Sequence, residues 1–266
     1  MTNNSDNIIA GAIQFDVKTG DIDGNLSSAL AGIHRLGEKK AQIAVLPELW
    51  SCGFGNPAMI RRQAEKTPQI IDTLIKLAVK YQMIIAGSLP EISDNCLYNT
   101  MVIIDKDGTV AGQYRKIHLF SLIYEDKAFT PGNRAIVCNT SCGRIGVMIC
   151  FDLRFPEVCR TLAIQGARIV LISAQWPQSR ILHWDALLRA RAIENQLFIV
   201  ASNRVGNDGD LIFNGHSQII SPDGAILSRI IDQPAETTAQ INFNEIDTLR
   251  NRFDCLSQRI PAAYLL

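Results

Sequence analysis

Three side chains able to do chemistry together stand at the ends of strand-like segments. Glu48, Lys116 and Cys150 each come at or just past the end of such a run, at residues 43–47, 110–114 and 146–149. A carboxylate, an ammonium and a thiol that meet at one sheet edge suit acyl transfer. The carboxylate takes the thiol proton, the thiolate attacks a carbonyl carbon, and the ammonium stabilises the developing oxyanion.

Cys150 stands where a buried strand is expected to end and turn into a helix. The run from Gly146 to Ile149 is uncharged, the first charge is Asp152, and Pro156 suits the first turn of a helix. Ligands bind at this edge of open α/β sheets, and a nearby helix N-terminus favours a thiolate. Taken alone, however, a free cysteine more often packs as a small hydrophobic residue.

Each of the other two residues also has a structural interpretation. Glu48 is compatible with a solvated charge at a strand end, and Lys116 with a surface cation. The coincidence of three reactive types at three strand ends favours the catalytic interpretation over these alternatives.

The elements that position these residues alternate along most of the chain. This alternation predicts a layered α/β fold in a single domain over residues 1–266, with residues 1–6 a disordered lead-in. Strands are expected at 8–15, 42–48, 83–88, 98–104, 110–114, 144–149, 167–173, 198–202, 217–221 and 225–231. Helices are expected at 26–36, 69–81, 157–165 and 183–196, before a less regular tail.

Composition narrows the class of protein. The 266 residues include 26 Lys and Arg and 26 Asp and Glu, so no charge excess favours nucleic acid or an anionic membrane. No apolar run approaches the roughly 20 residues of a membrane span. The seven cysteines and four histidines lack zinc spacing, so no metal is expected, and reduced thiols in the cytoplasm are favoured over disulfides.

Three segments, read together, resemble the signature blocks of the nitrilase superfamily of carbon–nitrogen hydrolases. The blocks are Pro47-Glu48-Leu49-Trp50, Arg115-Lys116-Ile117-His118-Leu119 and Cys150-Phe151-Asp152-Leu153-Arg154-Phe155-Pro156-Glu157, and the similarity continues through 190–195 and Asn203-Arg204-Val205-Gly206. The resemblance implies a four-layer α-β-β-α sandwich. It also implies a Glu48–Lys116–Cys150 triad that releases ammonia through a thioester without metal or organic cofactor.

The same resemblance implies further site residues. The backbone N–H of Phe151 helps to hold the oxyanion, and a second glutamate follows the lysine block. Glu125 fits that position best, with Asp126 as the other contender, while His118 is expected to orient or pack rather than act as a base.

The segments after Cys150 and around Trp176 are most similar to the ω-amidase branch. Those enzymes hydrolyse the side-chain amide of 2-oxoglutaramate or 2-oxosuccinamate. Arg154 is a candidate to grip the remote substrate carboxylate, or else forms a buried pair with Asp152 or Glu157. Tyr124 and Trp176 either wall the pocket or pack as core aromatics.

Other functions stay open at this stage. The amide substrate is expected to be a small molecule, and N-carbamoyl amines or aliphatic amides are the alternatives to an ω-amidase substrate. A noncatalytic member that binds a metabolite or partner is the alternative of a different class. The resemblance also implies a homodimer formed through the helix after Cys150 and through the C-terminal region. Val158 and Leu162 share one face of that helix, and they are equally compatible with a dimer contact and with packing on the sheet.

Overall fold

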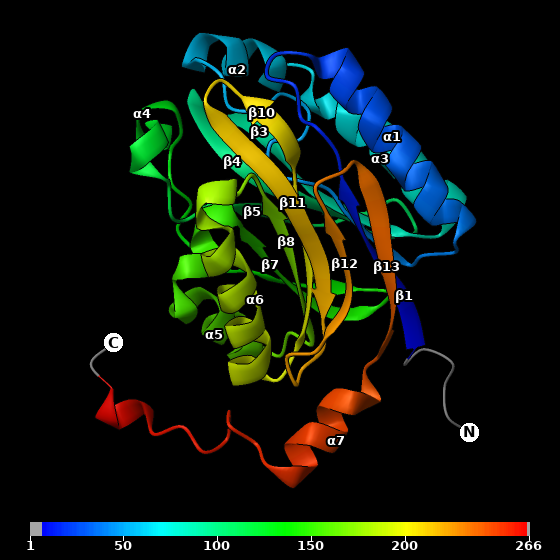
Figure 1. The fold of residues 1–266 in the computed structure, drawn as a ribbon, viewed down its shortest axis with the longest axis vertical. Helices are drawn as coiled ribbons and strands as arrows, with labels where there is room; N and C mark the ends of the chain where they lie inside the picture. Colours follow the sequence, from blue (N-terminus) through cyan, green and yellow to red (C-terminus); the bar gives the residue numbers. More distant parts are fainter. Residues whose placement is uncertain (1–6, 265–266) are drawn as a thin grey trace.

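Two β-sheets pack face to face, and helices cover both outer faces (Figure 1). This arrangement comes from a computed structural model, which describes residues 7–264. The four-layer α-β-β-α sandwich expected from the sequence is therefore confirmed. The expected disordered lead-in at residues 1–6 lies outside the described residues.

The first sheet has six strands in the order β13-β1-β2-β3-β4-β5. Its bounds are β1 (Asn7–Gln14), β2 (Ile43–Val45), β3 (Ile84–Ser93), β4 (Cys96–Ile104), β5 (Val110–Arg115) and β13 (Ala235–Asn242). The three central strands β1, β2 and β3 run parallel, whereas β4, β5 and β13 are antiparallel additions.

The second sheet has seven strands, with β12 paired to β11 beside the path β10-β11-β9-β8-β7-β6. Its bounds are β6 (Val137–Thr140), β7 (Gly143–Ile149), β8 (Ile169–Ala174), β9 (Phe198–Asn203), β10 (Val205–Asp208), β11 (Leu211–Ile220) and β12 (Ile226–Ile231). Strands β7, β8 and β9 are parallel neighbours, and their residues are almost all buried. Burial on both faces explains why these strands are continuous apolar runs in the sequence.

The helices divide between the two outer layers and the edges of the sandwich. The α-helices are α1 (Ile22–Glu38), α2 (Pro57–Ala64), α3 (Thr67–Tyr81), α4 (Glu125–Ala128), α5 (Pro156–Ile164), α6 (Ile181–Asn195) and α7 (Asn244–Arg252). Apolar side chains of α1 and α3 pack on the first sheet, and those of α5 and α6 pack on the second. A third apolar cluster fills the space between the sheets. No helix among residues 7–264 is long and apolar enough to cross a bilayer.

The sequence patterns did not predict every element. The tail expected to be irregular contains β13 and α7, and the expected loops contain β6, β10 and α2. Strand β13 lies at the edge of its sheet, and most of its residues are only partly buried, so its sequence lacks the apolar run of a central strand. The predicted core elements are all present, with bounds that differ by a few residues.

Four chain segments leave the two sheets beside one another. Glu48 follows β2, Lys116 follows β5, Cys150 follows β7 and Gln175 follows β8. Hydrogen bonds join the segments after β2 and β8, because Glu48 N donates to the carbonyl oxygen of Ala174. The fold thus gathers chemistry-bearing residues from both sheets at one place.

Candidate active site

Cys150 occupies a strained backbone turn. Its φ is +44°, in the left-handed region that residues other than glycine rarely adopt, and the 3₁₀-helix η2 (Cys150–Arg154) begins there directly after β7. The buried Asp152 carboxylate accepts from the Ile149 N–H at 3.0 Å and from the Tyr114 hydroxyl at 2.7 Å. These bonds fasten the turn that presents the thiol to the cavity.

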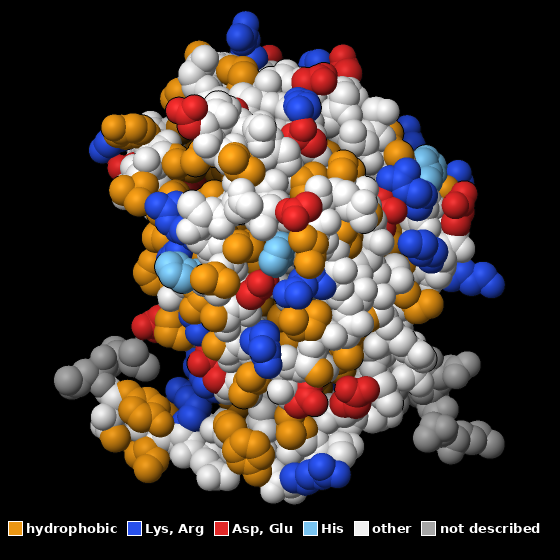
Figure 2. Space-filling view, viewed as in Figure 1, with side chains coloured by type: hydrophobic (Ala, Val, Ile, Leu, Met, Phe, Trp, Pro, Cys, Tyr) orange, Lys and Arg blue, Asp and Glu red, His pale blue; other side chains and the backbone are white. Residues whose placement is uncertain are grey.

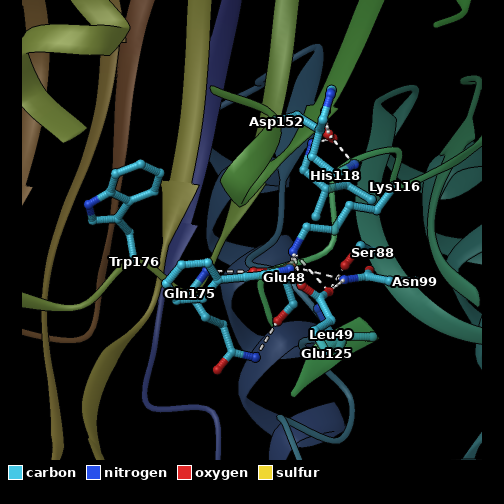
Figure 3. Close-up of polar contacts among 12 residues, drawn as sticks. Glu48, Leu49, Ser88, Asn99, Lys116, His118, Glu125, Asp152, Gln175 and Trp176 are labelled. Carbon is cyan, nitrogen blue, oxygen red and sulfur yellow. Dashed lines mark hydrogen bonds and ion pairs between the residues drawn. The ribbon is translucent and has the colours of Figure 1, made fainter. Parts of the chain in front are cut away.

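An ammonium between two carboxylates forms the centre of the site (Figure 3). Lys116 Nζ lies 2.7 Å from Glu48 Oε1, and 2.9 and 2.8 Å from the two oxygens of Glu125. All three residues are at most 2% exposed. Glu125 also accepts from the Phe120 N–H at 2.8 Å, which ties the start of α4 to the lysine.

Two amide side chains that the sequence analysis did not single out complete this cluster. Asn99 Nδ2 donates to Glu48 Oε1 at 2.9 Å and to Glu125 Oε1 at 3.2 Å. The Gln175 backbone N–H donates to Glu48 Oε2 at 3.1 Å, and Gln175 Nε2 donates to the Glu48 carbonyl at 2.8 Å. A strongly polar amide at the start of the mostly apolar strand 98–104 was the available signal for Asn99.

Burial and charge together set the protonation of the cluster. Burial raises the pKa of Glu48, although the Lys116 charge opposes this effect. Burial alone would lower the pKa of Lys116, but Glu125 and Glu48 more than compensate and raise it, so the ammonium persists at neutral pH.

Burial and a nearby carboxylate oppose ionisation of the Cys150 thiol. Burial, followed by the Glu48 charge, raises its pKa well above the ordinary value. These effects act against the thiolate that a helix N-terminus was expected to favour. The short η2 separates Cys150 from α5, and desolvation dominates. A thiol in this state needs a base to remove its proton, and Glu48 is close enough for the two groups to shift each other's pKa.

The cluster opens into a cavity of about 430 Å³. Glu48, Lys116, Glu125 and Cys150 all line it. Most of the remaining wall is apolar, and it includes Phe54, Phe120, Phe129, Phe151, Trp176 and Phe213. The reactive groups therefore line a largely apolar cavity rather than lying in a closed core.

Arg154 points into this cavity and not into a buried pair. Its guanidinium stacks over Trp176 at 4.7 Å and lies 3.3 Å from His183 Nδ1, while Asp152 bonds to other partners. The alternative of a pair with Asp152 or Glu157 is thus wrong. Arg180, which the sequence analysis did not single out, lines the same cavity. Within residues 7–264, neither guanidinium forms an ion pair with a carboxylate.

The remaining candidates divide between the wall and the surroundings. Trp176 is buried and Tyr124 is 73% exposed at the rim, so the core interpretation of Tyr124 is wrong. Asp126 pairs with Lys127 on the surface, which leaves Glu125 as the glutamate in the cluster. His118 Nδ1 lies 2.8 Å from Asp152 Oδ1, and its ring stacks on Phe155, the residue that follows η2.

The described residues contain no group of three or more His, Cys, Asp or Glu side chains placed to hold a metal ion. The seven cysteines are free. Cys52 and Cys159 are fully buried, and burial raises the pKa of each to about 12. Neither lines the cavity.

Comparison with known proteins places this geometry in context. The sequence profile of the carbon-nitrogen hydrolase family matches residues 9–251. A 2-oxoglutaramate amidase from Bacillus subtilis is 36% identical over 239 residues, covering 90% of this chain and 92% of the relative. A protein named hydrolase in agr operon, from Staphylococcus aureus, is 33% identical over 240 residues, covering 89% and 92%.

Solved structures share the fold. A CN-hydrolase superfamily protein from Xanthomonas campestris, with an arsenic adduct in its active site, superposes with a TM-score of 0.88. It is 28% identical in sequence, and the match covers 98% of this chain and 99% of that one.

Proposed function

Because the chain belongs to the carbon-nitrogen hydrolase family, we propose that it is an amidase that uses Glu48, Lys116 and Cys150 on a small amide. We further propose an ω-amidase, which releases ammonia from 2-oxoglutaramate or 2-oxosuccinamate. One observation carries the proposal: a base, an ammonium and a thiol border one cavity that also holds two guanidinium groups without carboxylate partners.

In the acylation step, Glu48 takes the Cys150 proton as the sulfur bonds to the amide carbon. The carbonyl electrons move to oxygen, and the oxyanion accepts from Lys116 Nζ and from the backbone N–H of Phe151. The tetrahedral intermediate collapses as protonated Glu48 gives its proton to the leaving nitrogen. The carbon–nitrogen bond breaks, and ammonia leaves a thioester on Cys150.

In the second step, Glu48 takes a proton from water, whose oxygen attacks the thioester carbon. The carbon–sulfur bond breaks, the acid leaves, and the proton returns to the sulfur. Glu125 serves as a positioning residue here, since its two oxygens hold Lys116 Nζ while Glu48 gains and loses a proton. The water-excluding burial of the cluster strengthens each of these interactions.

The two guanidiniums support a substrate that carries a carboxylate away from its amide. Guanidinium binds carboxylate bidentately, and Arg154 and Arg180 face the cavity that contains the thiol. Desolvation, followed by the charge of Arg180, lowers the pKa of Arg154, so an anion between them would relieve the repulsion of two like charges. Two relatives named 2-oxoglutaramate amidase, at 36% and 35% identity, agree with this substrate class.

A substrate panel tests the proposal. Ammonia release is measured from 2-oxoglutaramate, an N-carbamoyl amine and a simple aliphatic amide, with Cys150→Ala as the control. We expect release from 2-oxoglutaramate and a mass increase on Cys150 after rapid quenching. Ammonia release from the N-carbamoyl amine alone would identify N-carbamoyl amines, and not 2-oxo acid amides, as the substrate class. The absence of both ammonia release and a Cys150 adduct with every amide would favour a binding role.

We also propose that the protein works as a homodimer in the cytoplasm. The free thiols agree with a reducing compartment. Val158 and Leu162 of α5 pack on the sheet, which is the second of the two alternatives given for them. Exposed apolar side chains lie instead on α6 and on the C-terminal segment after α7, which runs away from the sandwich (Figures 1 and 2).

A further inference from the structure

Arg204 is a fully buried cation that the proposed reaction does not use. Its side chain is 0% exposed. It lies at the end of β9, which is parallel to β8 in a register that places Asn203 opposite Ala174. The chain therefore carries Arg204 to the side of Gln175, the residue whose backbone N–H reaches Glu48.

The bond between these two residues fixes the orientation of the Gln175 amide. Arg204 Nη1 donates to Gln175 Oε1 at 2.8 Å. A guanidinium has only donors, so the oxygen of the amide must face it and the nitrogen must face away. That nitrogen donates to the Glu48 carbonyl at 2.8 Å, so a chain of two bonds links Arg204 to the residue that carries the proposed base.

The guanidinium is itself held from several directions. Arg204 Nη2 lies 3.1 Å from Asp16 Oδ1, Arg204 Nη1 lies 3.8 Å from Asp208 Oδ2, and the group stacks 4.4 Å from the Phe213 ring. A buried charge that is paired on several sides is costly to move, because any displacement leaves a donor without a partner. Arg204 is thus a fixed point against which Gln175 rests.

Asn203, the residue before Arg204, holds Trp176, the residue after Gln175, in a similar way. Asn203 Oδ1 accepts from the Trp176 N–H at 2.6 Å, and Asn203 Nδ2 donates to the Trp176 carbonyl at 3.0 Å. The last residue of β9 and the residue after it thereby hold two consecutive residues after β8. The segment they hold contains the N–H that donates to Glu48 Oε2 and that also lowers the pKa of the Cys150 thiol.

We propose that Arg204 is a positioning residue, which holds Gln175 so that its backbone N–H stays directed at both Glu48 and Cys150. The proposal rests on the proposed roles of Glu48 and Cys150 but not on the identity of the amide. A purely structural role, by contrast, would make Arg204 a cross-link between loops with no effect on the reactivity of the thiol.

Alkylation of Cys150 by iodoacetamide separates these roles without a substrate. The rate is followed by mass spectrometry of the Cys150 peptide over a pH range, beside kcat and KM for 2-oxoglutaramate and the melting temperature. For Arg204→Met we expect slower alkylation at neutral pH, a higher pH midpoint, and kcat lower by about 10- to 100-fold with KM little changed. Arg204→Lys, which keeps the charge but not the planar fork, should restore part of the rate.

Arg168→Met is the matched control. Arg168 precedes β8, at the opposite end from Gln175, and donates to the Phe243 carbonyl at 2.6 Å and to Asp247 at 2.7 Å. We expect it to lower the melting temperature and leave the alkylation midpoint and kcat unchanged. If Arg204→Met does the same, the proposal is overturned.

A double-mutant cycle with Gln175→Met tests the route of the effect. If Arg204 acts through Gln175, the double variant should be no slower than the slower single variant, whereas additive losses would contradict that route. If Arg204→Met does not fold, the alkylation profile of Gln175→Met is the test. A profile for Gln175→Met that is the same as that of the wild type overturns the proposal. Inactivity of the wild type on 2-oxoglutaramate would refute the substrate assignment but leave the alkylation comparison intact.

Discussion

Arg154 has its guanidinium in the cavity with no carboxylate partner among the described residues, and we expect the substrate to supply one. In Arg154→Gln, KM for 2-oxoglutaramate should rise by about 10- to 100-fold, the value of a charged hydrogen bond. Hydrolysis of a neutral aliphatic amide should change little, because it has no carboxylate to lose. Steady-state kinetics on both substrates measure this difference, and equal losses on the two would count against a carboxylate site.

Glu48 is the second residue for which the geometry makes a sharp prediction. Glu48→Gln should lower kcat by about 10²- to 10⁴-fold, because the proposed base is removed while the side chain keeps its shape. The pKa of Cys150 should fall at the same time, since the Glu48 charge raises it and loss of a nearby negative charge favours the thiolate.

The ultraviolet absorbance of the thiolate follows this titration. The double variant Glu48→Gln/Cys150→Ala, which lacks the thiol, is the blank. A midpoint that stays in place or moves to higher pH would contradict the assigned electrostatics. Glu91→Gln is the control, because Glu91 pairs with Arg115 at 2.5 Å outside the cavity. It should retain wild-type activity.

The residues that the sequence made visible differ physically from those it did not. Glu48, Lys116 and Cys150 stand at the ends of apolar runs and within recognisable blocks, so local pattern singles them out. Their partners Asn99, Gln175 and Arg204 act through contacts between segments that lie far apart in the sequence, so they were given no role even though Arg204 lies in one of the similar segments. No spacing within one segment encodes such contacts, and only the assembled fold reveals them.

At the scale of elements, Asp152 joins three segments at the elbow, the turn from β7 into η2 that carries Cys150. Its Oδ2 accepts from the N–H of Ile149, the last residue of β7, and from the hydroxyl of Tyr114 in β5. Its Oδ1 accepts from the His118 N–H at 3.0 Å. Asp152→Asn places an amide nitrogen among these donors, so at least one donor loses its acceptor. We expect a loss of about 1.5–3 kcal/mol in the free energy of unfolding and a fall in activity.

Urea denaturation measures the stability of this variant beside Tyr114→Phe. The latter removes one neutral donor and should cost about 1 kcal/mol. Equal stability of wild type and Asp152→Asn would mean that the elbow does not depend on this carboxylate.

The burial of an element explains whether the sequence predicted it. The central parallel strands β7, β8 and β9 are mostly apolar because both faces are covered, and Cys150 and Gln175 directly follow β7 and β8. The edge strand β13 and the short helix α2 carry weaker patterns, and neither was predicted. The strands that lead to the candidate site were therefore easier to predict than the edges of the sheets.

At the scale of the whole molecule, the proposed dimer makes the last prediction. Leu182 on α6 is 79% exposed and Ile260 in the C-terminal segment is 65% exposed, so a partner that covers them would bury substantial apolar area. We expect light scattering after gel filtration to give twice the chain mass of 29.4 kDa, and Leu182→Glu to shift the protein toward the monomer. Val79→Glu, on the opposite helical layer, should remain dimeric. A wild-type mass of one chain would contradict the dimer, whereas dimers of all three would place the interface away from Leu182.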